Sequence, residues 1–214
     1  MKLYIANKNY SAWSFRPWLA MRVKGIDFEE VFVAFTDENR NPKFYDFSPT
    51  GKVPALVNGD VVIWESLAIL ESLAEKFPEH TLWPQPEKAR AHARAVAHEM
   101  HGGFEVLRSA CPMNMRRNAG PAAMDHPKAV QRDVTRIENL WQDCLDTYGG
   151  PFLFGEFTNA DAMFAPVVNR LEKYTLSEHP AVIDYSGTIK ALPAWVEWEE
   201  AALDEPWVVA VNEA

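Results

Sequence analysis

The stretch at residues 2–22, KLYIANKNYSAWSFRPWLAMR, constrains the fold more than any other part of the chain. Its apolar run at residues 3–6 is too short for a stable helix and is typical of a buried strand. A polar loop with three hydroxyl side chains follows, after which apolar residues recur at helical spacing. The stretch therefore predicts a strand, a hydroxyl-bearing loop and a helix in direct succession.

The start of this helix decides where the hydroxyl groups lie. We place the N-cap at Ser14, because Pro17 then falls at the third helical position, where its missing N–H group has no partner to lose. With Ser11 as the cap, Pro17 would lie deeper and remove an intrahelical hydrogen bond. We therefore expect Ser11 in the loop, beside a helix N-terminus whose free N–H groups favour an anion.

Strand signals continue to residue 64. The segments at 28–35 and 52–57 both have strand composition. The Asn-Gly-Asp turn at 58–60 and the apolar run at 61–64 predict that the last two strands pair as an antiparallel hairpin. Pro54 lies near the start of its strand, so it marks an edge or a turn, and a cis bond is one option there.

An amphipathic helix is expected directly after the hairpin. Its apolar residues recur on one face from Leu67 to Phe77, and Pro78 ends it. Ser66 is the expected N-cap, because a serine oxygen can accept a hydrogen bond from a free N–H group of the first turn.

Beyond Glu87 the periodicity is helical throughout. One apolar stripe runs from Ala89 to Cys111, where Gly102-Gly103 should bend the helix and Pro112 should end it. Further helices are expected at 127–148, 180–190 and 193–203. Another is expected to begin at a capping box formed by Thr158 and Asp161 and to be kinked at Pro166.

Composition limits the partners and the compartment. The 214 residues carry a formal net charge of −9, which argues against binding to nucleic acid or to an anionic membrane. No apolar run approaches the roughly 18 residues of a membrane span, and the N-terminus lacks a signal-peptide pattern, so we expect a cytoplasmic protein. Cys111 and Cys144 lie in helical patterns and are expected to be structural thiols.

Four motifs follow one another along the chain. They are S-x-x-S at 11–14, G-K-V-P-A-L-V at 51–57, W-E-S-L-A-I at 64–69 and F-L-F-G-E-F-T-N-A-D at 152–161. In sequence and spacing they resemble the glutathione transferase family, and the resemblance covers nearly the whole chain. It implies a homodimer, with an α/β thioredoxin-like N-terminal domain (βαβ-α-ββα) at 1–80, a linker at 81–86 and an all-α C-terminal helical domain at 87–214.

The resemblance also implies a site for glutathione as co-substrate. Val53, beside a cis Pro54, would offer its backbone N–H and C=O groups to the cysteinyl part. Ser66 and the helix N-terminus would bind the γ-glutamyl carboxylate, with Glu65 near the ammonium group. Lys52 would meet the glycyl carboxylate.

Ser11 matches the activating serine of the serine-type branches, with Ser14 in reserve and Tyr10 as a further candidate. A free thiol with a pKa of about 8.5 is mostly protonated at pH 7, so its thiolate needs preferential stabilisation. One hydroxyl donor plus a helix N-terminus supplies on the order of 1–3 kcal/mol. Because serines replace the cysteines of a C-x-x-C motif, dithiol exchange at this position is excluded.

The loop is also similar to that of the zeta class, which contains maleylacetoacetate isomerases and begins its motif S-S-C-S-W-R. Ser11, Ser14 and Arg16 agree with this motif, whereas Ala12-Trp13 replaces its Ser-Cys pair. As a whole, the resemblance to the glutathione transferase family implies a detoxification enzyme, a glutathione S-transferase that joins the glutathione thiolate to electrophilic substrates. A glutathione-dependent isomerase and a non-catalytic glutathione- or ligand-binding protein are the alternatives.

The pocket for the electrophile is expected between the Ser11 loop and the long helix that begins near residue 87. Its candidate residues are Trp13, Phe104, Leu107, Arg108, Met113 and Met115. Methionine suits a pocket that admits varied apolar shapes, but ordinary core positions explain the same apolar residues equally well. Arg108, Arg116 and Arg117 either pair with an acidic electrophile or form a solvated basic face.

The H-E-M-H run at residues 98–101 is similar to the zinc-binding motif H-E-x-x-H. In H-E-x-x-H the second histidine lies four positions after the first, whereas here it lies three positions after it, and no third ligand is evident. We therefore expect no metal.

Overall fold

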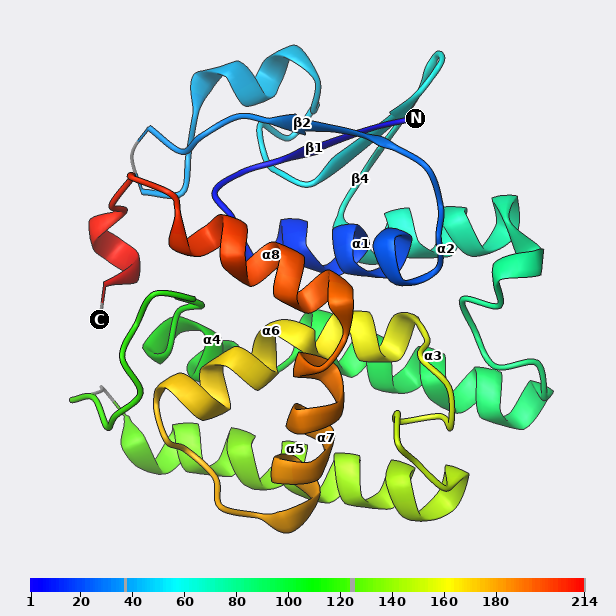
Figure 1. The fold of residues 1–214 in the computed structure, drawn as a ribbon, viewed down its shortest axis with the longest axis vertical. Helices are drawn as coiled ribbons and strands as arrows, with labels where there is room; N and C mark the ends of the chain where they lie inside the picture. Colours follow the sequence, from blue (N-terminus) through cyan, green and yellow to red (C-terminus); the bar gives the residue numbers. More distant parts are fainter. Residues whose placement is uncertain (37, 124–125, 214) are drawn as a thin grey trace.

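The computed structural model describes residues 1–36, 38–123 and 126–213. Its N-terminal part is a four-stranded mixed sheet in the order β2-β1-β3-β4 (Figure 1). The strands are β1 (Lys2–Ile5), β2 (Glu29–Phe32), β3 (Ala55–Asn58) and β4 (Val61–Trp64). β1 pairs in parallel with β2 and antiparallel with β3, and β3 pairs antiparallel with β4. The βαβ and ββα order predicted from the sequence is confirmed.

Two helices cover one face of this sheet, α1 (Ala12–Val23) and α2 (Ser66–Lys76) (Figure 1). The short 3-10 helix η1 (Pro42–Asp46) lies over the opposite face. α1 is buried on nearly all sides, because it lies between the sheet and the helices of the C-terminal half. This double burial explains why its sequence is apolar around much of its circumference.

The C-terminal half is helical, as predicted. Its helices are α3 (Glu87–Gly102), α4 (Glu105–Ala110), α5 (Pro127–Tyr148), α6 (Asn159–Lys173), α7 (Pro180–Lys190) and α8 (Pro193–Leu203). α6 packs against both α1 and α3, which places it in the centre of the molecule. Within the described residues, no helix combines the length and the apolar character needed to cross a membrane.

Two helix starts differ from the sequence prediction. α1 begins at Ala12, so Ser11 occupies the N-cap position and Pro17 lies inside the helix, where the carbonyl of Trp13 loses its N–H partner. The predicted cap at Ser14 is wrong, because the Ser14 hydroxyl contacts the end of β1 instead. The start of α2 is also shifted by one residue, since Glu65 holds the N-cap position and Ser66 is already helical.

The long stripe from Ala89 to Cys111 is two helices and not one bent helix. α3 ends at Gly102, and Phe104 adopts a left-handed conformation with φ of 55°. A Cβ atom on Gly103 would lie 2.6 Å from the carbonyl oxygen of Glu99, so only glycine fits this close approach. After α4 the chain reaches the loop that precedes α1, where Met115 N donates to the carbonyl oxygen of Asn9 at 3.3 Å.

The predicted capping box is present at the start of α6. The Thr158 hydroxyl accepts a hydrogen bond from Ala160 N, and the Thr158 N–H group donates to the Asp161 carboxylate. Complete burial raises the pKa of Asp161 to about 6, against the hydrogen bonds donated by Leu153, Thr158 and Tyr185. The box therefore fixes the N-terminus of the central helix.

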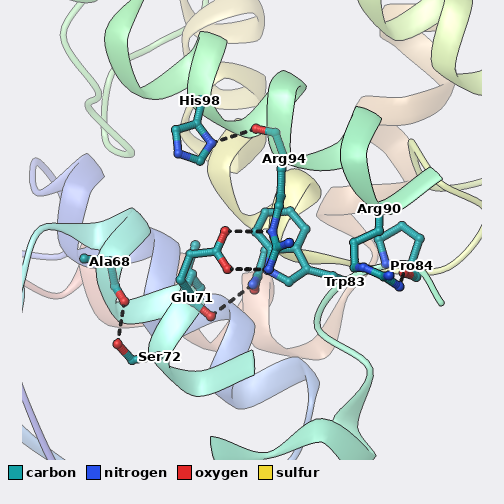
Figure 2. Close-up of polar contacts among 10 residues, drawn as sticks. Ala68, Glu71, Ser72, Trp83, Pro84, Arg90, Arg94 and His98 are labelled. Atoms are coloured by element: carbon teal, nitrogen blue, oxygen red, sulfur yellow. Dashed lines mark hydrogen bonds and ion pairs between the residues drawn. The ribbon is translucent and has the colours of Figure 1, made fainter. Parts of the chain in front are cut away.

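Polar contacts also join α2 to the segment that leads into α3 (Figure 2). Glu71 accepts hydrogen bonds from Trp83 Nε1 at 3.0 Å and from Arg94 at 3.1 and 3.2 Å. The Trp83 ring is buried beneath this pair. The linker expected at residues 81–86 is thus held against both halves, and its role as a domain boundary stays a prediction.

Candidate active site

Two serine hydroxyls meet at the N-terminus of α1. Ser11 Oγ donates a hydrogen bond to Ser14 Oγ at 2.7 Å, and Ser14 Oγ also accepts the N–H group of Ala6 at 3.3 Å. Both serines are buried, with Ser11 exposed by 5 % and Ser14 by 0 %. Of the two, Ser11 alone lines a cavity.

We call this space the main cavity, with a volume of about 640 Å³. Its walls come from the Ser11 loop, from segments 38–40 and 50–53, and from residues 108–113 of the helical half. Trp13, Lys52, Val53, Arg108 and Met113, all predicted from the sequence, line it. The structure thus brings residues from distant parts of the chain to one cleft beside the start of α1.

A second space of about 290 Å³, the inner cavity, adjoins the main cavity and shares Trp13, Lys52, Val53 and Arg108 with it. It is additionally lined by Pro54 and Glu65, two further predicted residues, and by His101.

The inner cavity has the backbone features expected of a peptide site. The Val53-Pro54 bond is cis, and Glu65 has a φ of 69°, which turns the chain sharply into α2. Ser66 Oγ is buried and makes no hydrogen bond with any residue that the structure describes. A buried hydroxyl without a partner is costly, so this atom at a helix N-terminus is suited to a ligand carboxylate.

His101 was considered only as a zinc ligand in the sequence, yet it lies beside Glu65. Its Nε2 is 3.8 Å from Glu65 Oε2, and its ring packs edge-on against Trp13 at 5.3 Å between centroids. Burial lowers the pKa of His101, while Glu65 acts in the opposite direction. No cluster of three or more His, Cys, Asp or Glu side chains suited to a metal occurs among the described residues.

Trp13 is flanked by two guanidinium groups. The central carbon of Arg16 lies 3.9 Å from the indole centroid, and that of Arg108 lies 5.3 Å from it. Arg16 is fully buried and donates to the carbonyl oxygens of Met163 and Ala12. Burial first, and then the charges of Arg170 and Arg108, hold its pKa well below the usual value. These cation–π contacts fix the indole in the wall shared by both cavities.

Three predicted pocket residues, Phe104, Leu107 and Met115, are core residues instead. They are 0–8 % exposed, belong to the main hydrophobic cluster and line neither cavity. The sequence could not separate the two roles, because pocket walls and core positions follow the same helical spacing. Arg170 of α6 lines the main cavity and was missed, although a charged residue within an apolar helix was a usable signal.

The chain after α8 returns to the loop before Ser11. The Glu205 carboxylate accepts the N–H groups of Lys8 at 2.6 Å and Asn9 at 3.2 Å. Arg116 donates to the Tyr10 hydroxyl at 2.8 Å and also to the Glu205 carbonyl oxygen. Arg116 is therefore occupied in holding this segment and does not face the main cavity.

Tyr10, the third candidate for thiol activation, is bound within the same network. Its hydroxyl donates to the carboxylate of Glu213 and accepts from Arg116. Burial, followed by the Glu213 hydrogen bond, raises the pKa of the phenol. Tyr10 nevertheless lines the main cavity, whereas Arg117, which packs over the ring of Tyr174 at 4.4 Å, does not.

Comparison with known proteins agrees with this architecture. The family model described as "Glutathione S-transferase, N-terminal domain" matches residues 10–76. A probable maleylacetoacetate isomerase of Caenorhabditis elegans is 30% identical over 196 residues, covering 87% of this chain and 90% of the relative. A zeta-class glutathione S-transferase of Euphorbia esula is 31% identical, covering 78% of this chain and 75% of the relative.

Solved structures show the same fold. A glutathione transferase homolog from Burkholderia with bound glutathione superposes with a TM-score of 0.72 at 24% identity, covering 95% of this chain and 98% of the other. An α/β thioredoxin-like half with a helical half is therefore confirmed, and the chain belongs to the glutathione transferase family. It is an enzyme of the glutathione transferase type, and its relatives include proteins named for the zeta class and for maleylacetoacetate isomerase.

Proposed function

We propose that this enzyme binds glutathione across the inner and main cavities and transfers it to an electrophilic carbon, with Ser11 stabilising the thiolate. The observation that carries the proposal is the position of the Ser11 hydroxyl. It lies at the N-terminus of α1 and lines the same cavity as Val53 and Arg108. When bound, glutathione supplies the sulfur nucleophile.

Residues that line the inner cavity, together with Ser66, which directly follows the cavity-lining Glu65, suit the two ends of a tripeptide. Val53, beside the cis bond to Pro54, can pair with an extended peptide through its backbone groups. Ser66 Oγ and the first N–H groups of α2 suit a carboxylate, with Glu65 and His101 near an ammonium group. Lys52 lines both cavities and suits the glycyl carboxylate.

Ser11 acts as a hydrogen-bond donor in this scheme and not as a base or a covalent nucleophile. Its hydroxyl donates to Ser14, and within the described part of the chain neither serine has a histidine or carboxylate partner that would remove a proton. A hydroxyl donor together with the N-terminal dipole of α1 favours a thiolate by about 1–3 kcal/mol. Arg16 and Arg108 add positive charge to the same region.

Isomerisation is the second candidate, because the relatives include proteins named maleylacetoacetate isomerase. Such a reaction uses the same thiolate, which adds to a cis double bond and leaves after rotation. Trp13 stands where the zeta motif has cysteine, so the main cavity is lined by a bulky indole at a position where the zeta class has a small side chain. We therefore favour conjugation.

Three measurements test the proposal: titration calorimetry with glutathione, an ultraviolet titration of the bound thiol, and turnover assays with a panel of neutral aryl halides and cis-enediones. We expect saturable binding, a thiolate absorbance that appears below the pKa of free glutathione, and turnover of aryl halides above that of the enediones. Binding without turnover of any electrophile would favour the ligand-binding alternative. Absence of glutathione binding would refute the proposal. The homodimer and the cytoplasmic location stay predictions, and sedimentation velocity tests the former.

A further inference from the structure

Two arginines from different helices face the main cavity on the side of the helical half. Arg108 belongs to α4 and is half-buried, whereas Arg170 belongs to α6 and is only 5 % exposed. Both line the main cavity, together with Trp13 and Met113. The cavity thus has two guanidinium groups on a wall that is otherwise partly apolar.

Neither guanidinium forms an ion pair with a carboxylate of the described residues. Arg170 donates Nε to the carbonyl oxygen of Cys111 at 2.9 Å and Nη1 to that of Pro166 at 3.2 Å. Arg108 donates Nε to the carbonyl oxygen of Gly103 at 3.1 Å. These bonds go to neutral carbonyl oxygens, so they hold the two side chains in place without a carboxylate from the described part of the chain in contact with either charge.

The charges also repel one another. Burial and then the charge of Arg108 lower the pKa of Arg170 to about 10. Burial, followed by the charges of Arg170 and Arg108, also lowers the pKa of Arg16. The acidic groups that counter Arg108 are Glu105 and Asp133, neither of which lines the cavity. Buried positive charge without a partner is strongly unfavourable, so an anion in the cavity would relieve the repulsion.

We propose that Arg108 and Arg170 bind a carboxylate on the electrophile, so that this enzyme prefers electrophiles that carry an anionic group. Two guanidinium groups suit a carboxylate because each offers parallel N–H donors in a planar fork. Trp13 and Met113 provide apolar surface for the remainder of the substrate. The inference rests on the proposed function, because it concerns the second substrate of the same site.

The proposed electrophile and the glycyl end of glutathione both carry a carboxylate, so either could bind the two arginines. Lys52, which lines both cavities, is the cation that the proposal assigns to that end. If Arg108 and Arg170 served glutathione, their removal would weaken glutathione binding. If they serve the electrophile, the affinity for glutathione stays within about threefold while the preference for an anionic electrophile is lost.

The test compares 4-chloro-3-nitrobenzoate with 4-chloro-3-nitrobenzamide, which have similar shape and differ in charge. Each kcat/KM is divided by the uncatalysed rate with glutathione, because the two compounds differ in intrinsic reactivity. We expect the wild-type enzyme to favour the benzoate at least tenfold. Arg108→Gln should reduce that preference at least fivefold, and because the preference is a ratio of the two compounds, any effect of Arg108 on the thiolate common to both cancels. Arg132→Gln, an exposed arginine of α5, is the matched control and should retain the preference.

A binding measurement tests the carboxylate site without turnover. Without glutathione, the unreactive 4-methyl-3-nitrobenzoate should bind the wild-type protein at least fivefold more tightly than its amide, and Arg108→Gln should abolish the difference. Equal binding of the two compounds would refute the carboxylate site even if glutathione turnover is normal. Preferential benzoate binding without any glutathione binding would support the anion site and refute the proposed function. A large loss of glutathione affinity in Arg108→Gln would assign the arginines to glutathione and overturn the inference.

Discussion

Ser11 donates its hydroxyl proton to Ser14 across 2.7 Å, at the point where β1, the loop and α1 meet. Ser14 Oγ also accepts the N–H group of Ala6, so the position of Ser14 is fixed by the end of β1. For Ser11 to donate to a sulfur atom in the main cavity, its O–H bond must rotate away from Ser14. The Ser14 hydroxyl can then donate to Ser11 Oγ, which would strengthen the outward hydrogen bond.

Replacing Ser11 with alanine should reduce turnover about tenfold or more, while the affinity for glutathione changes by less than about threefold, because the hydrogen bond benefits only the thiolate. The pKa of bound glutathione should rise toward that of the free thiol. Steady-state kinetics and an ultraviolet titration of the thiolate measure both quantities. Undiminished turnover would transfer the role to Ser14 or Tyr10.

Ser14→Ala should have a smaller effect on turnover, about three- to fivefold, but a larger effect on stability. The buried N–H group of Ala6 would lose its acceptor, which costs about 1–3 kcal/mol. Chemical denaturation measures this loss. The Ser11→Ala and Ser14→Ala effects on turnover should be non-additive in the double variant, because the serines act as one unit. Additive effects would show that Ser14 does not orient Ser11.

Ser66→Ala separates ligand binding from stability. Since Ser66 Oγ has no partner among the described residues, its removal should leave the free energy of unfolding unchanged or slightly increased. Loss of a hydrogen bond to a carboxylate should weaken glutathione binding about tenfold or more. Ser72→Ala on the same helix is the control, because Ser72 donates to the Ala68 carbonyl (Figure 2) and lines neither cavity. Equal affinities for the two variants would contradict this role.

Glu205→Gln should loosen the loop that precedes Ser11. Lys8 N and Asn9 N donate to different oxygens of the carboxylate, and in glutamine one of these oxygens is replaced by an NH2 donor. One hydrogen bond is then lost, so the unfolding free energy should fall by about 1–3 kcal/mol. Faster amide exchange at Lys8 and Asn9, with a lower kcat, would locate the effect. Glu200→Gln, exposed in the last turn of α8, should change neither. A stable variant with unchanged exchange would show that Glu205 does not hold the loop.

Cys111 and Cys144 should resist alkylation in the native protein. Burial raises the pKa of Cys111 to about 11 and that of Cys144 to about 12. Between about pH 9 and 11 the unfolded chain therefore loses thiol protons that the folded chain retains, so the unfolding free energy should fall as the pH rises. Iodoacetamide labelling at pH 8, with and without denaturant, measures the protection. Rapid labelling of the native protein would contradict it.

Local signals were sufficient for much of the secondary structure. Proline at the start of a helix and glycine at its end set the bounds of α5, and the Thr158 capping box set the start of α6. Likewise, the Asn-Gly turn fixed the β3–β4 hairpin. Each of these signals depends on residues within a few positions of one another, so it can be read without knowing the rest of the fold.

Through the order and spacing of its motifs, the sequence predicted Ser11, the Val53-Pro54 pair and Glu65, which line the two cavities, and Ser66 beside them, and their roles stay predictions. It misplaced the start of α1 and left the roles of Phe104, Leu107 and Met115 open. α1 is buried on both sides, so packing against the sheet and α6 outweighed the local penalty of an internal proline.

The sequence by itself determined the order of strands and helices and the hydroxyl-bearing loop before α1, and it offered a cis bond at Pro54 as one option. The tertiary structure alone decided that Arg170 faces the same cavity as Ser11, that His101 lies beside Glu65 and that Glu205 holds the loop at Lys8. These relationships join residues that lie far apart in the chain. They arise from how the helices pack against the sheet, which no short-range pattern records.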